Sequence, residues 1–227
     1  MNKYLYIVKA IHQRGVGFLF DYFKECILFD LRRGTSTSSR VPKVEQPLNN
    51  ENSDVQDGLL YVASFTSVTR NSVKTVFDYW GSENFFNAQY MDLGCGKGKT
   101  LIIFEEKYKN KLAHKPIGIE YDENLSELGK RNLEKSFKEP KSEIYCDSAI
   151  NLKKYARSDH LLIYLYNSFQ GETLQRTLDE LSEYKHIVIY VDPVEAKSFQ
   201  DRGYGLIHSQ VGKYNADTWS VFEYEPK

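Results

Sequence analysis

The segment from Tyr90 to Thr100, Tyr-Met-Asp-Leu-Gly-Cys-Gly-Lys-Gly-Lys-Thr, constrains the fold more than any other part of the chain. It predicts a buried strand with Asp92 at its end, a turn with glycine at every second position, and a helix that begins near Lys99. Alternating glycines allow the backbone to lie flat against a bound molecule, because they carry no Cβ atom and adopt positive φ angles at low cost. The segment therefore predicts a ligand-binding turn between a strand and a helix.

The spacing of the glycines differs from that of two common phosphate-binding turns. A Walker loop requires glycine five residues before Gly98, and Leu93 occupies that position. In a dinucleotide-binding turn the third glycine would fall on Lys99, whereas here it lies one residue earlier. The carboxylate of Asp92 would repel a phosphate but attract an ammonium or sulfonium group. These features indicate S-adenosylmethionine as the ligand.

Strands and helices alternate regularly after a first predicted helix near residues 68–80. The last two β-type runs have no helix between them, which predicts an antiparallel hairpin. The sequence thus predicts an α/β fold with a Rossmann-like sheet of seven strands, mostly parallel, ending in that hairpin. The predicted strands are 89–93, 116–120, 143–146, 161–166, 186–191, 205–211 and 218–224, and the predicted helices between them are 98–109, 122–137, 148–155, 170–184 and 194–201.

In an open α/β sheet the ligand lies beyond the carboxyl ends of the strands. The turn residues after the first strand, which suit the methionine part of the cofactor, are Gly94, Cys95, Gly96 and Gly98. Glu120 ends the second strand, 22 residues after Gly98, and its carboxylate can accept both ribose hydroxyls. Leu125 or the neighbouring Tyr121 can flank the adenine.

The third strand is followed by Asp147 and Ser148. The Asp147 carboxylate can accept the amino hydrogens of adenine, and the backbone N–H of Ser148 can donate to a ring nitrogen. A helix N-cap is the alternative role for Asp147.

The methyl acceptor is expected beyond the fourth strand, at Tyr166, Asn167 and Phe169. Methyl transfer requires an aligned nucleophile and, for some acceptors, removal of its proton. Asn167 can orient an amine or amide through its side-chain oxygen, or it can be a structural residue that closes the turn. Asp192 ends the fifth strand and is a candidate base or a partner for a substrate ammonium. Asn167 and Asp192 end neighbouring strands, where oxygen ligands of a metal could lie. We expect no metal, because only one of these two side chains, Asp192, is a carboxylate.

These segments together resemble the class I S-adenosylmethionine-dependent methyltransferases over residues 68–225. The matching segments are Asp92-Leu93-Gly94-Cys95-Gly96-Lys97-Gly98, Gly118-Ile119-Glu120, Cys146-Asp147 and Tyr164-Leu165-Tyr166-Asn167-Ser168-Phe169. More narrowly, the last segment and Phe29-Asp30-Leu31-Arg32-Arg33-Gly34-Thr35 are similar to a bacterial group of unassigned substrate with a Tyr-Leu-Tyr-Asn-Pro-Phe-like motif. Here Ser168 replaces the proline. The resemblance implies a cofactor-dependent transferase of this fold.

Composition restricts the partners. The 227-residue chain carries 30 basic and 31 acidic residues, so no global field attracts it to nucleic acid. Its three cysteines lack metal-site or disulfide spacing, which favours a reduced cytoplasm. The apolar start of the chain is interrupted by charges and predicts no transmembrane segment.

Residues 1–58 predict an N-terminal helical arm and a polar loop, and residues 59–227 the methyltransferase domain. Residues 16–31 have an amphipathic pattern with a broad apolar face that includes Phe18, Phe20 and Phe23. We expect this face to pack on the catalytic domain or a second subunit, with a membrane-surface helix or a lid as alternatives.

The main functional hypothesis is methyl transfer to a nitrogen acceptor, on a protein or a small molecule, near Asn167. An O-methyltransferase for a sugar or other small metabolite, and a non-catalytic subunit of the same fold, are the alternatives.

Overall fold

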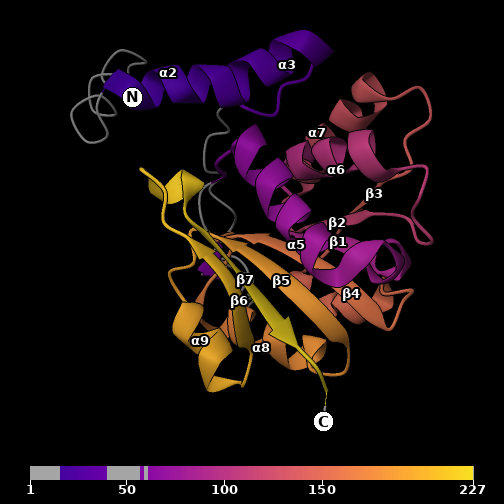
Figure 1. Ribbon diagram of the computed structural model, residues 1–227. Coiled ribbons are helices and arrows are strands. Elements are labelled where there is room, and N and C mark those ends of the chain that lie inside the picture. The colour runs from indigo at the N-terminus through magenta and orange to yellow at the C-terminus, as the bar shows by residue number, and fades with distance from the viewer. Residues whose placement is uncertain (1–15, 40–56, 59–60, 227) are drawn as a thin grey trace, which may run out of the picture.

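The computed structural model describes residues 16–39, 57–58 and 61–226. Its centre is a seven-stranded sheet in the order β3-β2-β1-β4-β5-β7-β6 (Figure 1). Neighbouring strands from β3 to β5 are parallel, and β7 runs antiparallel to both β5 and β6. The predicted α/β fold, with its mostly parallel sheet and C-terminal antiparallel hairpin, is confirmed.

The strands are β1 (Gln89–Leu93), β2 (Ile117–Glu120), β3 (Glu143–Cys146), β4 (His160–Tyr166), β5 (Lys185–Val191), β6 (Gly205–Gln210) and β7 (Trp219–Tyr224). The helices are α2 (Val16–Tyr22), α3 (Leu28–Arg33), α5 (Thr66–Asn87), α6 (Lys99–Tyr108), α7 (Glu123–Ser136), α8 (Gly171–Leu181) and α9 (Ala196–Asp201). A π-helical turn, η1 (Phe23–Ile27), joins α2 to α3, and 3-10 turns lie at η2 (Ala149–Lys154) and η3 (Asn215–Asp217).

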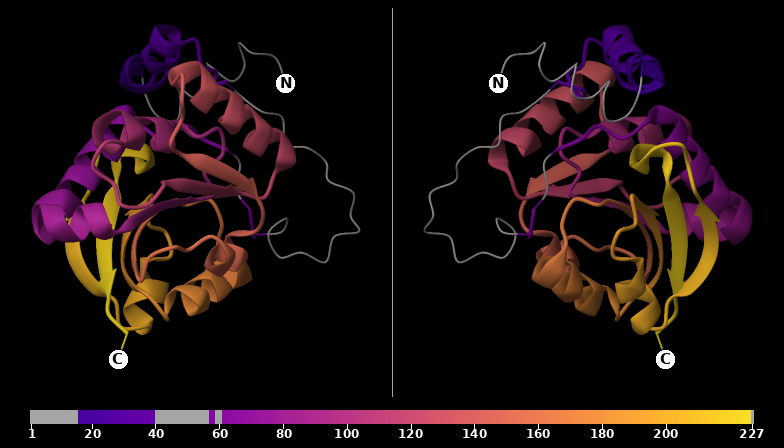
Figure 2. Two further views of the ribbon diagram at one scale, coloured as in Figure 1. Left: turned by 90° about the vertical axis from the view of Figure 1, so that its right-hand side faces the viewer. Right: turned by 90° about the vertical axis from the view of Figure 1, so that its left-hand side faces the viewer.

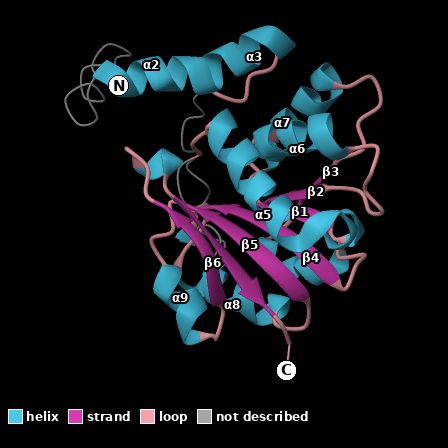
Figure 3. Ribbon diagram, in the orientation of Figure 1, coloured by secondary structure: helices cyan, strands magenta, loops and turns pink. Residues whose placement is uncertain are grey.

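The sheet has a buried side chain on nearly every position of its central strands, because helices cover both faces (Figures 2 and 3). On one face Tyr90 and Tyr164 belong to the hydrophobic cluster that α5 and α6 complete. On the other face Met91 and Ile163 pack in a second cluster with residues of α8. Strand order reverses between β1 and β4, so a crevice lies beyond the carboxyl ends of these two central strands.

Two helices show how local sequence sets the element ends. The side chain of Asp122 caps α7 by accepting the backbone N–H of Leu125 at 3.0 Å, as its position after β2 predicted. Helix α5 is longer than the predicted helix 68–80 and consists of two segments that meet at Gly81, where φ is 74°. The pattern did not predict this continuation beyond Trp80, because glycine usually ends a helix.

The N-terminal arm, defined here as residues 16–39, packs across the end of the molecule next to α5 and α6 (Figure 1). Phe18, Cys26 and Phe29 are buried in the same cluster as α5 and α6. Phe20 and Phe23, which the pattern placed on the same apolar face as Phe18, point to solvent instead. The broad apolar face is therefore divided between the body of the protein and its surface. The rest of the predicted arm and loop, residues 1–15 and 40–56, lies outside the described residues.

The buried carboxylate of Asp30 organises the turn that follows α3. Its oxygens accept hydrogen bonds from the hydroxyl of Thr35 at 2.6 Å, the N–H and hydroxyl of Thr37 at 2.9 and 2.8 Å, and the N–H of Ser38 at 2.7 Å. A further bond comes from the Ser38 hydroxyl. These bonds outweigh the effect of burial and lower the pKa of Asp30. The turn depends on this one side chain.

We expect Asp30→Ala to lower the free energy of unfolding by about 2–4 kcal/mol, because it leaves several buried donors without an acceptor. Urea unfolding at pH 7 measures the change. Asp78→Ala is the matched control: Asp78 is exposed on α5 and pairs only with Lys74, so its loss should cost less than about 0.5 kcal/mol. Equal effects of the two substitutions would contradict the role given to Asp30.

Candidate functional site

A cavity with a volume of about 870 Å³ lies at the carboxyl ends of β1 and β4. Residues from four strand ends, the segment before α5 and the β6–β7 loop line it. Among the predicted site residues, those in its wall are Asp92, Gly94, Cys95, Glu120, Tyr121, Tyr166, Asn167, Phe169 and Asp192. Side chains predicted separately for cofactor and acceptor thus line one continuous cavity.

Asp92 and Glu120 place two buried carboxylates in this wall. Asp92 accepts a hydrogen bond from the Thr100 hydroxyl. Burial raises the pKa of Asp92 to about 7, and the nearby Glu120 adds to this shift. Burial likewise raises the pKa of Glu120 to about 7, although the N–H groups of Asp122 and Gly96 oppose the shift. No ion pair with either carboxylate occurs among the described residues, so the pair is suited to a cationic ligand.

Glu120 also fixes the shape of the glycine turn. Its Oε2 accepts the N–H of Gly96 at 2.8 Å, and its Oε1 accepts the N–H of Asp122 at 3.0 Å. Each carboxylate oxygen keeps further acceptor capacity, because an ionised carboxylate accepts about four hydrogen bonds. The residues present therefore fit the ribose hydroxyls of S-adenosylmethionine at Glu120 and its ammonium or sulfonium group at Asp92.

Gly96 does not itself line the cavity; it allows a close approach to the ring of Tyr61. A Cβ atom at Gly96 would lie 2.2 Å from Tyr61 Cε2, and φ is 50° there. Gly98, also outside the cavity wall, adopts a φ of 75° at the N-cap of α6. Gly96 and Gly98 thus serve the fold of the turn and the packing of Tyr61, and Gly94 lines the cavity.

The two lysines of the glycine turn bind the N-terminal arm and not an anion. Lys97 Nζ donates to the carbonyl of Ser36 at 3.2 Å and to the hydroxyl of Ser39 at 2.6 Å. Lys99 Nζ donates to the carbonyls of Glu25 at 2.8 Å and Ser64 at 2.5 Å. Burial lowers the pKa of both lysines. Their ammonium groups are thus engaged by the arm and by Ser64, so that the remaining charged groups of the cavity wall are Lys213 and the carboxylates of Asp92, Glu120 and Asp192.

Asn167 and Asp192 form a hydrogen-bonded pair in the wall of the cavity. Asn167 Nδ2 donates to Asp192 Oδ2 at 3.0 Å, and Asn167 Oδ1 accepts Gln170 Nε2 at 2.9 Å. In the described chain these are the two non-glycine residues with positive φ, at 34° and 51°. Such backbone conformations are costly and concentrate at functional sites. The structure therefore brings together the two predicted acceptor residues that come from β4 and β5.

Asp147 and Ser148 do not line the cavity. Asp147 accepts the N–H of Ser148 at 2.8 Å, Asn151 Nδ2 at 2.7 Å and the hydroxyl of Tyr155 at 2.7 Å, and these bonds lower its pKa despite burial. The N-cap position of η2 belongs to Ser148, whose hydroxyl accepts the N–H of Ile150 at 3.2 Å. The contact of Asp147 and Ser148 with adenine stays a prediction.

Several cavity residues were not among the predicted ones. Tyr61 comes from the segment before α5, Tyr164 from β4 and Thr100 from the first turn of α6. Lys213 and Tyr214 come from the β6–β7 loop. The predicted C-terminal hairpin was the one feature of the sequence that could have indicated this, because it places the β6–β7 loop at the same end of the sheet as the cavity. Nothing in the sequence around Tyr61 indicated that the chain returns to the glycine turn there.

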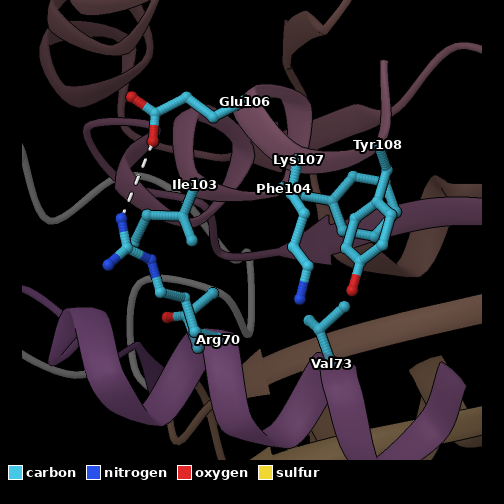
Figure 4. A pocket seen from close by; sticks show the side chains of 8 residues that line it. Arg70, Val73, Ile103, Phe104, Glu106, Lys107 and Tyr108 are labelled. Carbon is cyan, nitrogen blue, oxygen red and sulfur yellow. Dashed lines mark ion pairs between the residues drawn. The ribbon is translucent and has the colours of Figure 1, made fainter. Parts of the chain in front are cut away.

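A second cavity of about 260 Å³ lies between α5 and α6 (Figure 4). Its polar edge is an ion pair between Arg70 and Glu106 at 3.9 Å, and Glu106 also pairs with Arg33 of the arm at 2.5 Å. No strand end contributes to this cavity. The described residues contain no cluster of histidine, cysteine or carboxylate side chains that could hold a metal ion.

The sequence matches no known protein-family model and no curated protein. Solved structures do match the fold. MtNAS in complex with MTA and tNA aligns with a TM-score of 0.50 at 11% identity, covering 69% of this chain and 61% of that one. A mutant of MtNAS is described in complex with S-adenosylmethionine and aligns with a TM-score of 0.49 at 12% identity, over 69% of this chain and 63% of that chain. This chain therefore spans less than two thirds of the length of these two MtNAS chains.

A methylase and a methyltransferase are also among the neighbours. The ribosomal protein L11 methylase from Lactobacillus delbrueckii subsp. bulgaricus has a TM-score of 0.47 at 11% identity, over 71% of this chain and 78% of that chain. The tRNA methyltransferase TrmK from B. subtilis has a TM-score of 0.47 at 16% identity, over 69% and 65%. Such identities show the fold alone, and the narrower bacterial group stays a prediction.

We expect Gly96→Ala to weaken binding of S-adenosylhomocysteine at least tenfold, because the new methyl group would displace Tyr61 and disturb the turn held by Glu120. Calorimetric titration measures the affinity. Gly203→Ala is the matched control, since Gly203 has a φ of 84° but no atom within 4 Å of an added Cβ. Its backbone strain is comparable, and binding should be unchanged. Equal losses in both variants would argue against a local effect.

The raised pKa values of Asp92 and Glu120 predict how stability depends on pH. A carboxyl with a raised pKa in the folded state stabilises the protein fully below its unfolded pKa of about 4, and this contribution is lost as pH rises through about 7. We expect the thermal midpoint of the free chain to fall between pH 6 and pH 8, and Asp92→Asn to reduce that fall. Thermal unfolding at both values measures it. Parallel profiles for the two proteins would contradict the assignment.

Proposed function

We propose that this chain is an S-adenosylmethionine-dependent methyltransferase that acts on a nitrogen acceptor held at Asn167 and Asp192. One observation carries the proposal. A single cavity joins the carboxylates of Asp92 and Glu120, which form no ion pair within the described residues, to a strained, hydrogen-bonded Asn167–Asp192 pair. Perturbed carboxylates in a cleft and strained backbone are both features that concentrate at functional sites.

The cofactor end of the site comprises the glycine turn with Asp92, Glu120 and Tyr121. When bound, S-adenosylmethionine supplies a methyl group activated by its sulfonium centre. Asp92 attracts the cationic part of this molecule and Glu120 accepts hydrogen bonds from the ribose. Cationic charge next to Asp92 offsets the burial that raises its pKa, so binding favours the ionised form.

The acceptor end relies on Asp192 more directly than on Asn167. Both polar atoms of the Asn167 amide already have partners, in Asp192 and Gln170. Asp192 uses Oδ2 for this pairing, and its Oδ1 has no hydrogen-bond partner among the described residues. That oxygen is suited to accept an N–H of an amine and to hold the proton that the nitrogen loses on methylation. Asn167 orients the carboxylate, and Tyr166 forms the adjoining wall.

A neutral hydroxyl acceptor on a sugar or other small metabolite is the second candidate, because Asp192 could accept the proton of a hydroxyl in the same way. The amine is favoured by the charge of the cavity wall. Its described residues include three carboxylates and two lysines, and one of these, Lys99, donates to the arm. An excess of carboxylates attracts a basic nitrogen more than a neutral hydroxyl.

We expect Asp192→Asn to lower kcat about 10²-fold while cofactor affinity stays within twofold, since it removes the proton acceptor and keeps the shape of the side chain. The assay follows formation of S-adenosylhomocysteine with a panel of amines and, in parallel, of hydroxyl compounds. Asp201→Asn, at the exposed end of α9, is the control.

The outcomes separate the candidate functions. Turnover with hydroxyl compounds alone would assign O-methylation. Tight cofactor binding with no turnover of either class would favour a non-catalytic subunit of this fold.

A further inference from the structure

The outer side of the N-terminal arm carries a stripe of exposed apolar side chains. Val16, Phe20 and Leu31 are 69%, 70% and 69% exposed, and Phe23 is 47% exposed. Positions 16, 20 and 23 follow the i, i+4, i+7 spacing of one helix side. The opposite side of the arm is buried through Phe18, Cys26 and Phe29, so the stripe has no partner within the described chain. We call these four exposed residues the arm stripe.

The arm's acidic side chains are all turned away from this surface. Asp21 accepts the hydroxyl of Tyr214 at 3.2 Å, Glu25 accepts the N–H of Ser67 at 2.9 Å, and Asp30 is enclosed by its own turn. The basic side chains Lys24 and Arg32, by contrast, are exposed. They directly follow Phe23 and Leu31 of the arm stripe. The outward charge of the arm is therefore positive, although its sequence contains acids and bases.

We propose that the arm stripe docks on a lipid surface that contains anionic headgroups. An apolar helix side bordered by lysine and arginine is the arrangement that lies in a membrane interface, with the apolar residues at the acyl boundary and the bases at the headgroups. None of the helices in the described ranges is long and apolar enough to cross a membrane, so the contact is interfacial.

Charge favours lipid over a second copy of the chain. A symmetric pair of arm stripes would bring Lys24 and Arg32 of both copies together, and no acidic side chain of the arm faces outward to compensate them. The segment before the arm, residues 1–15, contains Lys3, Lys9 and Arg14 and no acidic residue, together with several apolar residues. Its composition suits the same anionic, partly apolar partner.

Docking would bring the cavity close to the lipid. The buried side of the arm touches the β6–β7 loop, where the rings of Phe18 and Tyr214 are 5.0 Å apart, and Tyr214 lines the cavity. The loop is thus separated from the docked surface by one helix diameter, about 10 Å.

Vesicle flotation with the full chain tests the proposal. We expect binding to phosphatidylcholine vesicles that contain about 30% phosphatidylglycerol, chosen to provide a surface charge, and much weaker binding to phosphatidylcholine alone. Phe20→Ser combined with Phe23→Ser should lower the partition coefficient at least tenfold. Lys24→Glu combined with Arg32→Glu should abolish the preference for the anionic vesicles. Leu206→Ser, at an exposed apolar residue on the edge strand β6, is the control and should bind like the unaltered chain.

Two results would overturn the proposal. The first is that the unaltered chain does not bind anionic vesicles at low salt, although a cooperative thermal transition shows that it is folded. The second is a dimer in light scattering that the double serine variant converts to a monomer, which would assign the arm stripe to a second copy. None of these measurements depends on methyl transfer, so the proposal stands or fails separately from the proposed function.

Discussion

The hydrogen bond from the Gly96 N–H to the Glu120 carboxylate connects the parts of this site. It joins the turn after β1 to the end of β2, next to the bonds from Gly94 and Cys95 to the carbonyl of Ile119 at 2.8 and 3.1 Å. Because Glu120 is buried, each of its oxygens must be satisfied by the backbone or by a ligand. The same carboxylate therefore holds the turn in shape and presents acceptor capacity to the cavity.

The N-terminal arm is bound to this turn from the other side. Lys97 and Lys99 place their ammonium groups on backbone oxygens of the arm, and Lys99 also on that of Ser64. A buried ammonium is costly unless it is hydrogen-bonded, so loss of the arm would remove hydrogen-bond acceptors from both lysines beside the glycine turn. The arm also reaches the cavity wall at Tyr214, whose hydroxyl donates a hydrogen bond to Asp21.

Stability and function oppose each other in the cavity. Asp92 and Glu120 would be less costly as neutral groups, which is why burial raises their pKa to about 7. The left-handed backbone at Asn167 and Asp192 has a similar cost. A cationic ligand removes the first cost, and the Asn167–Asp192 hydrogen bond partly offsets the second.

The sequence alone determined the order of strands and helices, the antiparallel hairpin and the strand ends that meet at the cavity. These follow from local patterns: alternation of apolar segments, glycine at every second position after Asp92, and a helix cap at Asp122. The tertiary structure decided what depends on contacts across long distances in the chain, namely the position of Tyr61 over Gly96, the binding of Lys97 and Lys99 to the arm, and the division of the arm's apolar face. Side-chain periodicity predicts which residues lie on the same side of a helix. It does not predict which of them pack on the protein and which are exposed to solvent. The contact of Asp147 with a ligand, which its place after β3 suggested, stays a prediction; in the structure its carboxylate accepts hydrogen bonds from Ser148 and Asn151.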